Sequence, residues 1–421
     1  MLGPDEPRYA AIGQAMAESG DWVTPRLWGE GWFEKPPLLY WMTVLAVKAG
    51  CDEDLAPRLP VALMSVAFLM FFFFVLRGGF GQRAAWFSTV VLGTSAGWLA
   101  YSHVAVPDLP MSATFAASML LLLPLPGGRG SVLLAGILLG SAVLAKGLVP
   151  LALFVPALWW MRHRLRDATL VLATALVIAA PWYVLVTARN GSAFIDEFFW
   201  KHHFARIVSP SLMHVRPVWF YVPVLLAALF PWTPLLFLLS RRSHRFLLAW
   251  FAWGFVLFSL SLNKLPGYLL PLLPPMAALI GIALAESPAR SRITAVALAA
   301  CAALLWFMPA VQEILPQALL NGLTRATTHF PVGFVLPFLL FAVICGALDF
   351  FDRRGFAVAL VWIGVTFGVA RIVWQTFPVL DRTVSPRAFW RVNSVTCIPA
   401  DNRSWRYGLD YYAGRNLPDC N

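Results

Sequence analysis

The stretch "LPVALMSVAFLMFFFFVL", residues 59–76, decides the fold class. It carries no charged residue and approaches the roughly 20 apolar residues that cross the hydrocarbon core of a bilayer. Residues 168–187 and 246–262 have the same character. Of the 421 residues, 59% are hydrophobic and 13% are charged, which is about half of the ~25% charged residues usual in soluble domains. The sequence therefore predicts an all-α polytopic membrane protein.

We expect about twelve transmembrane helices, near residues 57–76, 84–103, 109–123, 131–146, 148–161, 168–187, 217–239, 246–262, 267–285, 293–311, 332–348 and 355–374. Six of the short loops between them hold 13 arginines, whereas the opposite short loops hold almost no basic residue apart from Lys146 and Lys264. Because basic residues in short loops mark the cytoplasmic side, this pattern predicts an orientation. The net charge of +11 then reflects topology and does not indicate nucleic-acid binding.

This orientation predicts three parts of the chain. They are residues 1–56, a first periplasmic loop with juxtamembrane helices; residues 57–374, the transmembrane domain, with periplasmic loops near 104–110, 188–216, 263–267 and 312–331; and residues 375–421, a small periplasmic α/β or irregular cap. An even number of spans places both termini outside. Since no signal peptide precedes the first loop, we expect the translated chain to begin upstream, with a first transmembrane helix that is missing here.

The tail contains Cys397 and Cys420, and the other three cysteines are scattered. Two cysteines in an exported segment can form a disulfide, and the alternative is a pair of buried thiols. No Cys-x-x-Cys pair is present, so a cysteine metal site is not expected.

Polar residues gather on the predicted outer side, beginning with "GPDEPRYA", residues 3–10. Helix capping explains Asp5, because Asp is a favoured N-cap and Pro fits the first turn. Capping does not explain why Arg8 and Tyr9 arrive together with the carboxylates of Asp5 and Glu6. Charged groups beside a membrane core are costly and mark functional sites, so this motif is a candidate site.

The stretch "GWFEKPPLLYW", residues 31–41, places Lys35 between Glu34 and two prolines. The prolines can begin a helix, whose free N–H groups would then lie close to Lys35. A cation at a helix N-terminus opposes the dipole, whereas an anion is stabilised there. Lys35 is therefore a candidate ligand for a phosphate or carboxylate, and a simple ion pair with Glu34 is the alternative.

Four more residues lie at the outer ends of predicted spans: Asp108, Lys146, Lys264 and Tyr268. Capping of the next helix is the alternative for Asp108, and snorkelling to the interface is the alternative for Lys146. Lys264 and Tyr268 belong to a proline-rich break between two spans, and broken helices at membrane depth are tolerated where they line a cavity.

The loop "FFWKHHFARIVSP" adds paired histidines and Arg206. Adjacent histidines on one helix are poor co-ligands, so we do not expect a metal bound through both. Carboxylates and cations on one face suit a reaction with an anionic leaving group, because a departing phosphate needs its growing charge neutralised. No P-loop, dinucleotide fingerprint or nucleophile elbow is present.

The stretch "PDEPRYAAIGQAMAESGDWVTPRLWGEGWFEKPPLLYW" resembles the first outer loop of the bacterial aminoarabinose transferases. These are GT-C glycosyltransferases of the protein mannosyltransferase type. The resemblance continues in order through "VAVPDLP", "LAKGLVP", "FFWKHHFARI" and "LNKLPGYLLPLLP" and covers residues 3–275. The family has one span before the first loop and a longer C-terminal domain, which is reduced here to about 47 residues.

The resemblance implies a GT-C fold in the bacterial inner membrane and a sugar donor carried on undecaprenyl phosphate. It implies transfer with inversion on the periplasmic face to a lipid A, glycan or protein acceptor. The implied catalytic residues are Asp5, Asp108 and Glu6, and the implied substrate-binding residues are Arg8, Tyr9, Glu34, Lys35, Lys146, His203, Arg206, Lys264 and Tyr268. Glu34 and His203 resemble positions that share a divalent ion. A metal requirement stays open, and no cofactor is the default expectation.

A transporter or flippase for an anionic lipid is the rival class, and a receptor for polyprenyl phosphate is a third. A transporter is expected to place polar groups near the midplane between two repeats, whereas here they gather on one face and no repeat is seen. Loss of Asp5 and Asp108 would favour the receptor, and both residues are present.

Overall fold

The computed structural model describes residues 3–123, 128–204, 215–239, 244–321, 326–327, 335–398 and 403–420. Helices make up nearly all of its regular structure, which confirms the predicted all-α class. The named strands in these ranges are two short antiparallel ones, β1 (Arg26–Leu27) and β2 (Glu30–Gly31). The chain forms two compact units. Unit 1 takes in the described residues of Met1–Ala11, Phe230–Leu238 and Glu286–Asn421, and unit 2 those of Ile12–Leu229 and Leu239–Ala285.

Helix α1 (Asp5–Ser19) begins in unit 1 and continues into unit 2. The other helices of unit 2 are α2 (Leu38–Lys48), α3 (Leu59–Thr94), α4 (Ala96–Tyr101), α5 (Asp108–Leu121), α6 (Arg129–Lys146), α7 (Val149–Leu153), α8 (Val155–Trp160), α9 (Leu165–Ile195), the π-helix η1 (Asp196–Phe204), η2 (Val218–Phe220), α11 (Tyr221–Ala228), α12 (Arg245–Leu260), η4 (Pro266–Leu272) and α13 (Leu273–Glu286). Those of unit 1 are η3 (Thr233–Leu238), α14 (Arg292–Leu304), η5 (Leu305–Phe307), α15 (Met308–Asn321), α16 (Val335–Phe350), α17 (Arg354–Thr383), α18 (Arg387–Val392) and α19 (Arg403–Ala413).

Six helical segments in the described ranges are long and apolar enough to cross a membrane: Leu59–Thr94, Arg129–Lys146, Leu165–Lys201, Pro266–Glu286, Arg292–Leu320 and Arg354–Thr383. Shorter apolar helices accompany them. The most apolar window of Pro266–Glu286 is 83% buried, whereas that of Leu165–Lys201 is 28% buried. Most of the first window therefore lies inside the described structure, whereas most of the second window is not buried in it. These features fit a multi-pass membrane protein, and the count of twelve spans stays a prediction.

The 36-residue helix α3 contains a break at Gly81, whose φ of 82° and ψ of 168° are not helical. Glycine adopts this left-handed region without a steric cost. The break falls between the spans expected at 57–76 and 84–103, beside Arg77 and Arg83. The element is thus two helical pieces joined at a glycine.

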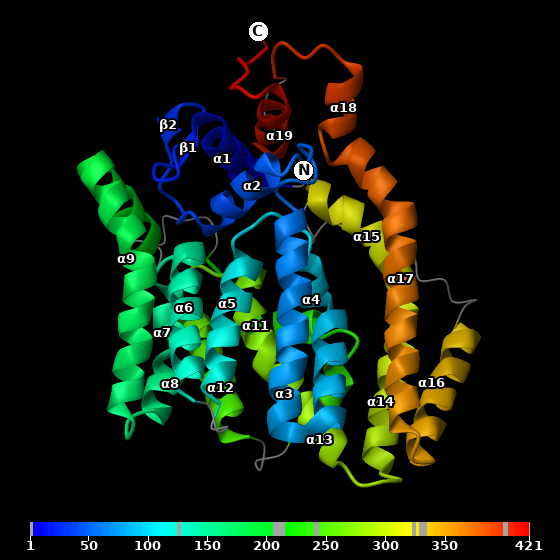
Figure 1. The fold of residues 1–421 in the computed structure, drawn as a ribbon. Coiled ribbons are helices and arrows are strands. Elements are labelled where there is room, and N and C mark those ends of the chain that lie inside the picture. The colour runs from blue at the N-terminus through cyan, green and yellow to red at the C-terminus, as the bar shows by residue number, and fades with distance from the viewer. Residues whose placement is uncertain are drawn as a thin grey trace. The chain divides into compact units, whose positions relative to one another are not determined.

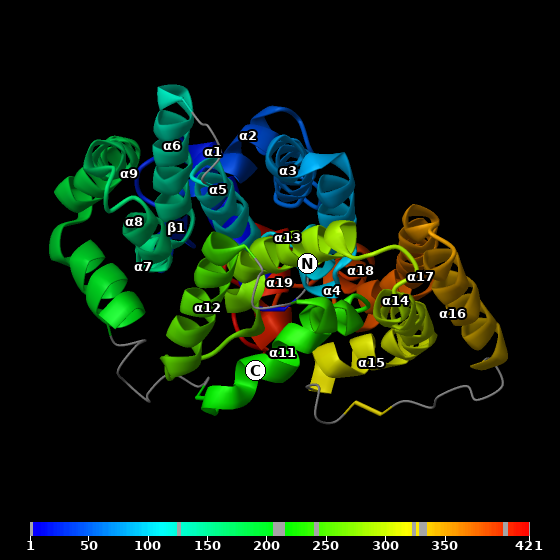
Figure 2. The ribbon, with the colours of Figure 1, turned by 90° about the horizontal axis from the view of Figure 1, so that it is seen from below.

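Helix α5 lies at the centre of its bundle and packs between α6 and α3 (Figures 1 and 2). Nearly all of its residues are buried. Helix α6 in turn packs on α9, and glycines make this approach close. A Cβ atom added to Gly140 would lie 2.8 Å from the carbonyl oxygen of Ala175. Small residues at such positions let helix backbones approach in membranes.

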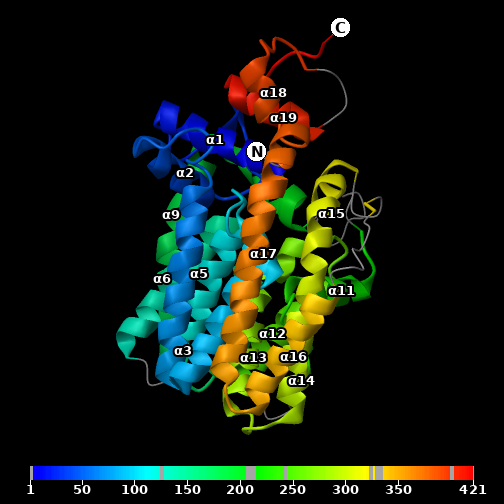
Figure 3. The ribbon, with the colours of Figure 1, turned by 90° about the vertical axis from the view of Figure 1, so that its right-hand side faces the viewer.

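In unit 1, helices α14, α16 and α17 lie side by side (Figure 3). A buried polar cluster joins the turns at their common end. Asp349 is fully buried, and its carboxylate accepts hydrogen bonds from Arg354 Nε and Thr294 Oγ1, each at 2.6 Å. Arg354 also donates to the carbonyl oxygen of Ser287 at 2.9 Å. A buried charge of this kind is stable only when its polar atoms are satisfied.

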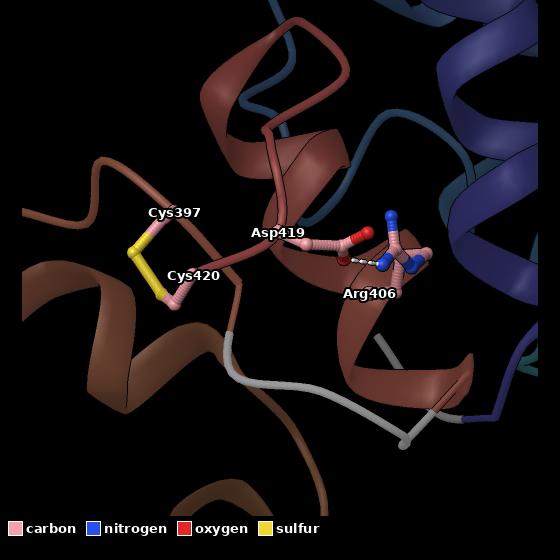
Figure 4. Close-up of a disulfide and its surroundings, with 4 residues drawn as sticks. All are labelled: Cys397, Arg406, Asp419 and Cys420. Carbon is pink, nitrogen blue, oxygen red and sulfur yellow. Dashed lines mark hydrogen bonds and ion pairs between the residues drawn. A yellow bond between two sulfur atoms is a disulfide. The ribbon is translucent and has the colours of Figure 1, made fainter.

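The C-terminal segment is closed by a disulfide between Cys397 and Cys420 (Figure 4). Of the two alternatives left by the sequence, the structure has the disulfide. Ile398 and Asp419 form a parallel bridge beside it, and Asp419 is ion-paired with Arg406. The predicted division at residues 56 and 374 stays a prediction.

Candidate active site

Asp108 and Lys146 form the central ion pair of the site. Asp108 opens helix α5 after Pro107, and Lys146 is the last residue of α6. The two helices pack together, and this brings Lys146 Nζ to 2.6 Å from Asp108 Oδ1. The Lys146 side chain is 9% exposed and the Asp108 side chain is 17% exposed. Neither helix capping by the Asp108 side chain nor snorkelling by Lys146 describes this arrangement, because the two groups bind each other below the surface.

The backbone of helix η4 approaches this pair closely at Gly267. A Cβ atom added to Gly267 would lie 2.5 Å from Asp108 Oδ1 and 2.6 Å from the hydroxyl oxygen of Tyr101. The carboxylate and the phenol therefore both lie against this glycine. Tyr268, the next residue, places its ring 4.8 Å from Lys146 Nζ, measured to the ring centroid. The sequence predicted Asp108 and Tyr268 at one site, and the structure brings them together through Lys146.

Lys264 lies in the turn between α12 and η4, where it is only 3% exposed. Its Nζ donates hydrogen bonds to the carbonyl oxygens of Ser261 and Arg216, the latter at 3.1 Å. In the described part of the chain no carboxylate pairs with this ammonium. Burial lowers the pKa of Lys264 because desolvation disfavours the charged form. Such a group gains stability from an anion that docks beside it.

Glu34 and Lys35 form the ion pair that the sequence offered as one of two alternatives. Lys35 Nζ lies 3.2 Å from Glu34 Oε1, and the side chains are 11% and 9% exposed. Helix α2 begins three residues later, at Leu38. The pair is anchored by Phe33, which packs edge-on against Phe194 with ring centroids 5.5 Å apart. An ion pair here does not exclude an anion at Lys35, because an ammonium has three donors.

The N-terminal motif belongs to unit 1. Arg8 is ion-paired with Asp5 one helical turn away. The Arg8 side chain is 6% exposed, whereas that of Asp5 is 56% exposed. Glu6 and Tyr9 are buried. The predicted meeting of Asp5 with the residues of unit 2 stays a prediction.

Two predicted residues cannot be placed. Arg206 and the side chain of His203 lie outside the described residues. Among the described residues, no group of three or more His, Cys, Asp and Glu side chains is placed to hold a metal ion. Glu34, the other expected ligand, is bound to Lys35.

Sequence reasoning missed four residues around the site. Tyr101 and Gly267 contact the Asp108 region, and the hydroxyl of the buried Tyr221 donates to the carbonyl oxygen of Leu265 at 3.2 Å. Glu197 of η1 accepts a hydrogen bond from the backbone N–H of Phe33 and so supports the segment before Glu34. π-Helical turns are frequent at functional sites. The Gly-Tyr pair within "LPGYL" was the available signal for Gly267, and no local signal marks Tyr101.

Residues 2–222 match the model of the dolichyl-phosphate-mannose-protein mannosyltransferase family. The chain therefore belongs to this family of membrane glycosyltransferase sequences.

More particular relatives are undecaprenyl phosphate-α-4-amino-4-deoxy-L-arabinose arabinosyl transferases. The chain is 32% identical over 308 residues to such a protein from Pseudomonas fluorescens, covering 67% of this chain and 52% of the relative. It is also 32% identical over 306 residues to one from Pseudomonas aeruginosa, covering 67% of this chain and 55% of the relative. The matched region thus spans little more than half of the length of these relatives.

Solved structures give the same picture. The structure of ArnT from Cupriavidus metallidurans bound to undecaprenyl phosphate has a TM-score of 0.73 and 27% sequence identity, and the comparison covers 100% of this chain and 85% of that chain. The arabinosyltransferase EmbB from Mycobacterium smegmatis has a TM-score of 0.53 and 15% identity, covering 98% of this chain and 41% of that one. The second likeness shows the fold alone. The GT-C architecture predicted from the sequence is confirmed.

Proposed function

We propose that this chain is an inverting membrane glycosyltransferase that moves a sugar from undecaprenyl phosphate to an acceptor on the periplasmic face of the bacterial inner membrane. The observation that carries the proposal is the part-buried Asp108–Lys146 pair, whose carboxylate lies close to Gly267. Nearby in the chain, Lys264 offers a desolvated ammonium that bonds only to carbonyl oxygens within the described residues. The reaction uses a carboxylate at the acceptor and a cation that can bind the leaving phosphate.

The transfer breaks the bond between the anomeric carbon and the phosphate oxygen, and it forms a bond from that carbon to an acceptor oxygen. The electron pair of the broken bond stays on undecaprenyl phosphate. Lys35 and Lys264 are assigned to neutralise this growing charge. Stabilisation of the charge that develops in the transition state is usually the largest single contribution to catalysis. Arg8 and Arg206 are further candidates for phosphate contacts.

Asp5 and Asp108 are assigned as the acids of the site, with Glu6 as a supporting carboxylate. A hydroxyl acceptor needs a base, and either aspartate can take its proton. A phosphate acceptor is already anionic and needs no base. Lys146 orients the Asp108 carboxylate through their ion pair.

The first donor to test is undecaprenyl phosphate carrying 4-amino-4-deoxy-L-arabinose, because the relatives are named for this substrate. Lipid A is the first acceptor to test, with glycans and proteins after it. The binding of undecaprenyl phosphate by the Cupriavidus ArnT supports the choice of lipid carrier. The periplasmic placement of the loops and of the tail after residue 374 rests on the arginine pattern.

Purified protein in nanodiscs is given this donor and lipid A, and the product is followed by its mass. We expect transfer by the wild type and a loss of about 10²–10⁴-fold in kcat for Asp108→Asn. Asp167→Asn is the matched control, because Asp167 sits in a surface ion pair with Arg164, and it should keep the wild-type rate. Equal rates for Asp108→Asn and the wild type would overturn the assignment.

A transporter or receptor for the same lipid is the alternative. It would bind undecaprenyl phosphate and give no product with any donor and acceptor tested. Binding is measured in the same nanodiscs, so the two outcomes can be told apart. NMR of the product tests inversion at the anomeric carbon.

A further inference from the structure

We propose that Tyr407, in the C-terminal helix α19, is a positioning residue of the transfer site, and that its ring holds the Arg8 guanidinium in its ion pair with Asp5. This inference rests on the proposed function, which assigns Asp5 and Arg8 to the site. All three residues belong to unit 1. The family match ends at residue 222, so it gives α19 no role.

The contacts of Arg8 carry the argument. Its guanidinium carbon lies 5.3 Å from the ring centroid of Tyr407 and 5.7 Å from that of Tyr9. One of its terminal nitrogens donates to Asp5. Because the arginine side chain is 6% exposed and that of Asp5 is 56% exposed, the buried cation faces aromatic rings and the carboxylate faces outward. A guanidinium within about 6 Å of a ring is attracted by it, more strongly where water is excluded.

Tyr407 is held in place by its own helix. Its neighbour Gly408 packs against the ring of Pro386, where an added Cβ atom would lie 2.9 Å from Pro386 Cδ and closer still to its Cγ. The residue after Gly408, Leu409, is fully buried in a cluster with Ile398 and Leu417. Helix α19 is therefore fixed at the junction of α17 and α18 and cannot slide without losing this contact.

The segment that bears Tyr407 is also tied at its end. The disulfide and the bridge between Ile398 and Asp419 join the two sides of α19 (Figure 4). Asp410 Oδ1 accepts a hydrogen bond from the backbone N–H of Leu417 at 2.8 Å. These contacts fix the position of the Tyr407 ring beside Arg8.

A consequence for catalysis follows. Without the ring, Arg8 can leave Asp5 and turn toward solvent, because arginine has many rotamers. Asp5 then loses its orientation, which affects the chemical step more than donor binding. A misplacement of this kind costs rate although no reacting group is removed.

The test compares three variants in the transfer assay. Tyr407→Leu should lower kcat about 10-fold with the KM for the donor changed less than about 2-fold. Tyr407→Phe keeps the ring and should restore kcat. Phe389→Leu is the matched control, because Phe389 packs on Trp405 within the same cap at 5.3 Å between ring centroids, and it should leave kcat unchanged. An equal loss in Phe389→Leu, or no rescue by Tyr407→Phe, would overturn the positioning role.

A double-mutant comparison asks whether Tyr407 acts through Arg8. In an Arg8→Lys background, Tyr407→Leu should cost less than about 2-fold, because contacting residues are non-additive. A full 10-fold cost there contradicts the inference.

A second readout does not depend on transfer. Phenylglyoxal should modify Arg8 several-fold faster in Tyr407→Leu than in the wild type or in Phe389→Leu, as followed by peptide mass. If the wild type is inactive with every donor but its Arg8 is labelled more slowly than that of Tyr407→Leu, the proposed function is refuted and the contact between Tyr407 and Arg8 is not. Unchanged labelling would refute the contact.

Discussion

At the scale of single residues, Lys264 combines a positive charge with nearly complete burial. Its ammonium bonds to two carbonyl oxygens, which solvate a cation but do not neutralise it. Burial lowers its pKa, so the group loses its proton at a lower pH than an ordinary lysine does. A phosphate beside it reverses this effect and stabilises the charged form.

The affinity for undecaprenyl phosphate should therefore fall as pH rises from 7 to 10. Lysine is charged below its pKa and neutral above it, and the lowered pKa brings the loss of affinity to lower pH. Lys264→Arg should flatten the profile, because a guanidinium stays protonated throughout this range. Binding is measured in nanodiscs at each pH, and a profile that is identical in the two proteins would remove Lys264 from the phosphate site.

Gly267 is the second residue with a direct prediction. An added methyl group would overlap Asp108 and Tyr101, so Gly267→Ala should push η4 away from the ion pair. A displacement of about 1 Å at a reacting group can cost about 10²-fold in rate. We expect this loss in kcat together with retained folding by thermal melting. The control is Gly128→Ala, where an added Cβ atom meets nothing within 4 Å.

Much of the site was predictable at this scale, for a physical reason. Charges beside apolar spans stand out in the sequence, and this marked Asp108, Lys146 and Lys264. Their pairing was not predictable, because it depends on how α5 and α6 pack. Tyr101 gave no signal at all, since one tyrosine at the end of a span is ordinary at a membrane interface.

At the scale of elements, the C-terminal half of α9 holds the segment that begins at Asp21. Trp182 Nε1 donates to the carbonyl oxygen of Val23 at 2.9 Å, and Asn190 donates to Thr24 Oγ1 at 3.1 Å. Arg189 is ion-paired with Asp21 at 2.8 Å. These contacts fix the loop that ends at Lys35, so α9 acts as its support.

Asp21 gives this support a dependence on pH. Burial raises its pKa, but hydrogen bonds from the backbone N–H groups of Val23 and Thr24 and the charge of Arg189 outweigh burial and lower it. Because the pKa of Asp21 is lower in the folded state, its carboxylate contributes to the free energy of unfolding at pH values above the unfolded pKa of about 3.9. This contribution is lost as the pH falls below that value.

We expect Asp21→Asn to melt about 1–2 °C below the wild type at pH 6, with a cost of about 1 kcal/mol. The difference should shrink on acidification, because the wild-type carboxylate becomes protonated as well. Melting in detergent between pH 6 and pH 3 checks this. A difference that stays constant with pH would contradict the role of the charge.

Element boundaries were predicted well where hydrophobicity alone determines them. The break at Gly81 falls between two expected spans, because a glycine and flanking arginines end a membrane helix from both sides. The helices of the first loop and the π-helix η1 were less visible. The segment between α1 and α2 is held by residues of α9 that lie far away in the sequence, and η1 continues α9 directly, so composition does not mark where it begins.

At the scale of the whole molecule, the disulfide makes the tail a separate stabilised segment. Cys397 and Cys420 are 23 positions apart, and closing such a loop contributes about 2–4 kcal/mol. The double variant Cys397→Ser/Cys420→Ser should therefore expose α19 to protease while the transmembrane helices stay intact. Limited proteolysis with and without reductant measures this, and an equally protected tail in the variant would contradict it.

The sequence could predict the class of the molecule from end to end, because the bilayer imposes helices on any long apolar run. It could not predict which parts of the chain form each compact unit. The two units interleave along the chain, with Phe230–Leu238 joining residues after 286. Such an assignment depends on three-dimensional contacts and not on local composition.

The contact between Arg8 and Tyr407 joins helix α1 to helix α19. During synthesis Arg8 leaves the ribosome long before Tyr407 does, and the apolar helices between them can enter the membrane in the meantime. Until Tyr407 has emerged, an inserted nascent chain holds Arg8 without the ring that covers it, so a chain halted before α19 should occupy the membrane with Arg8 open to phenylglyoxal.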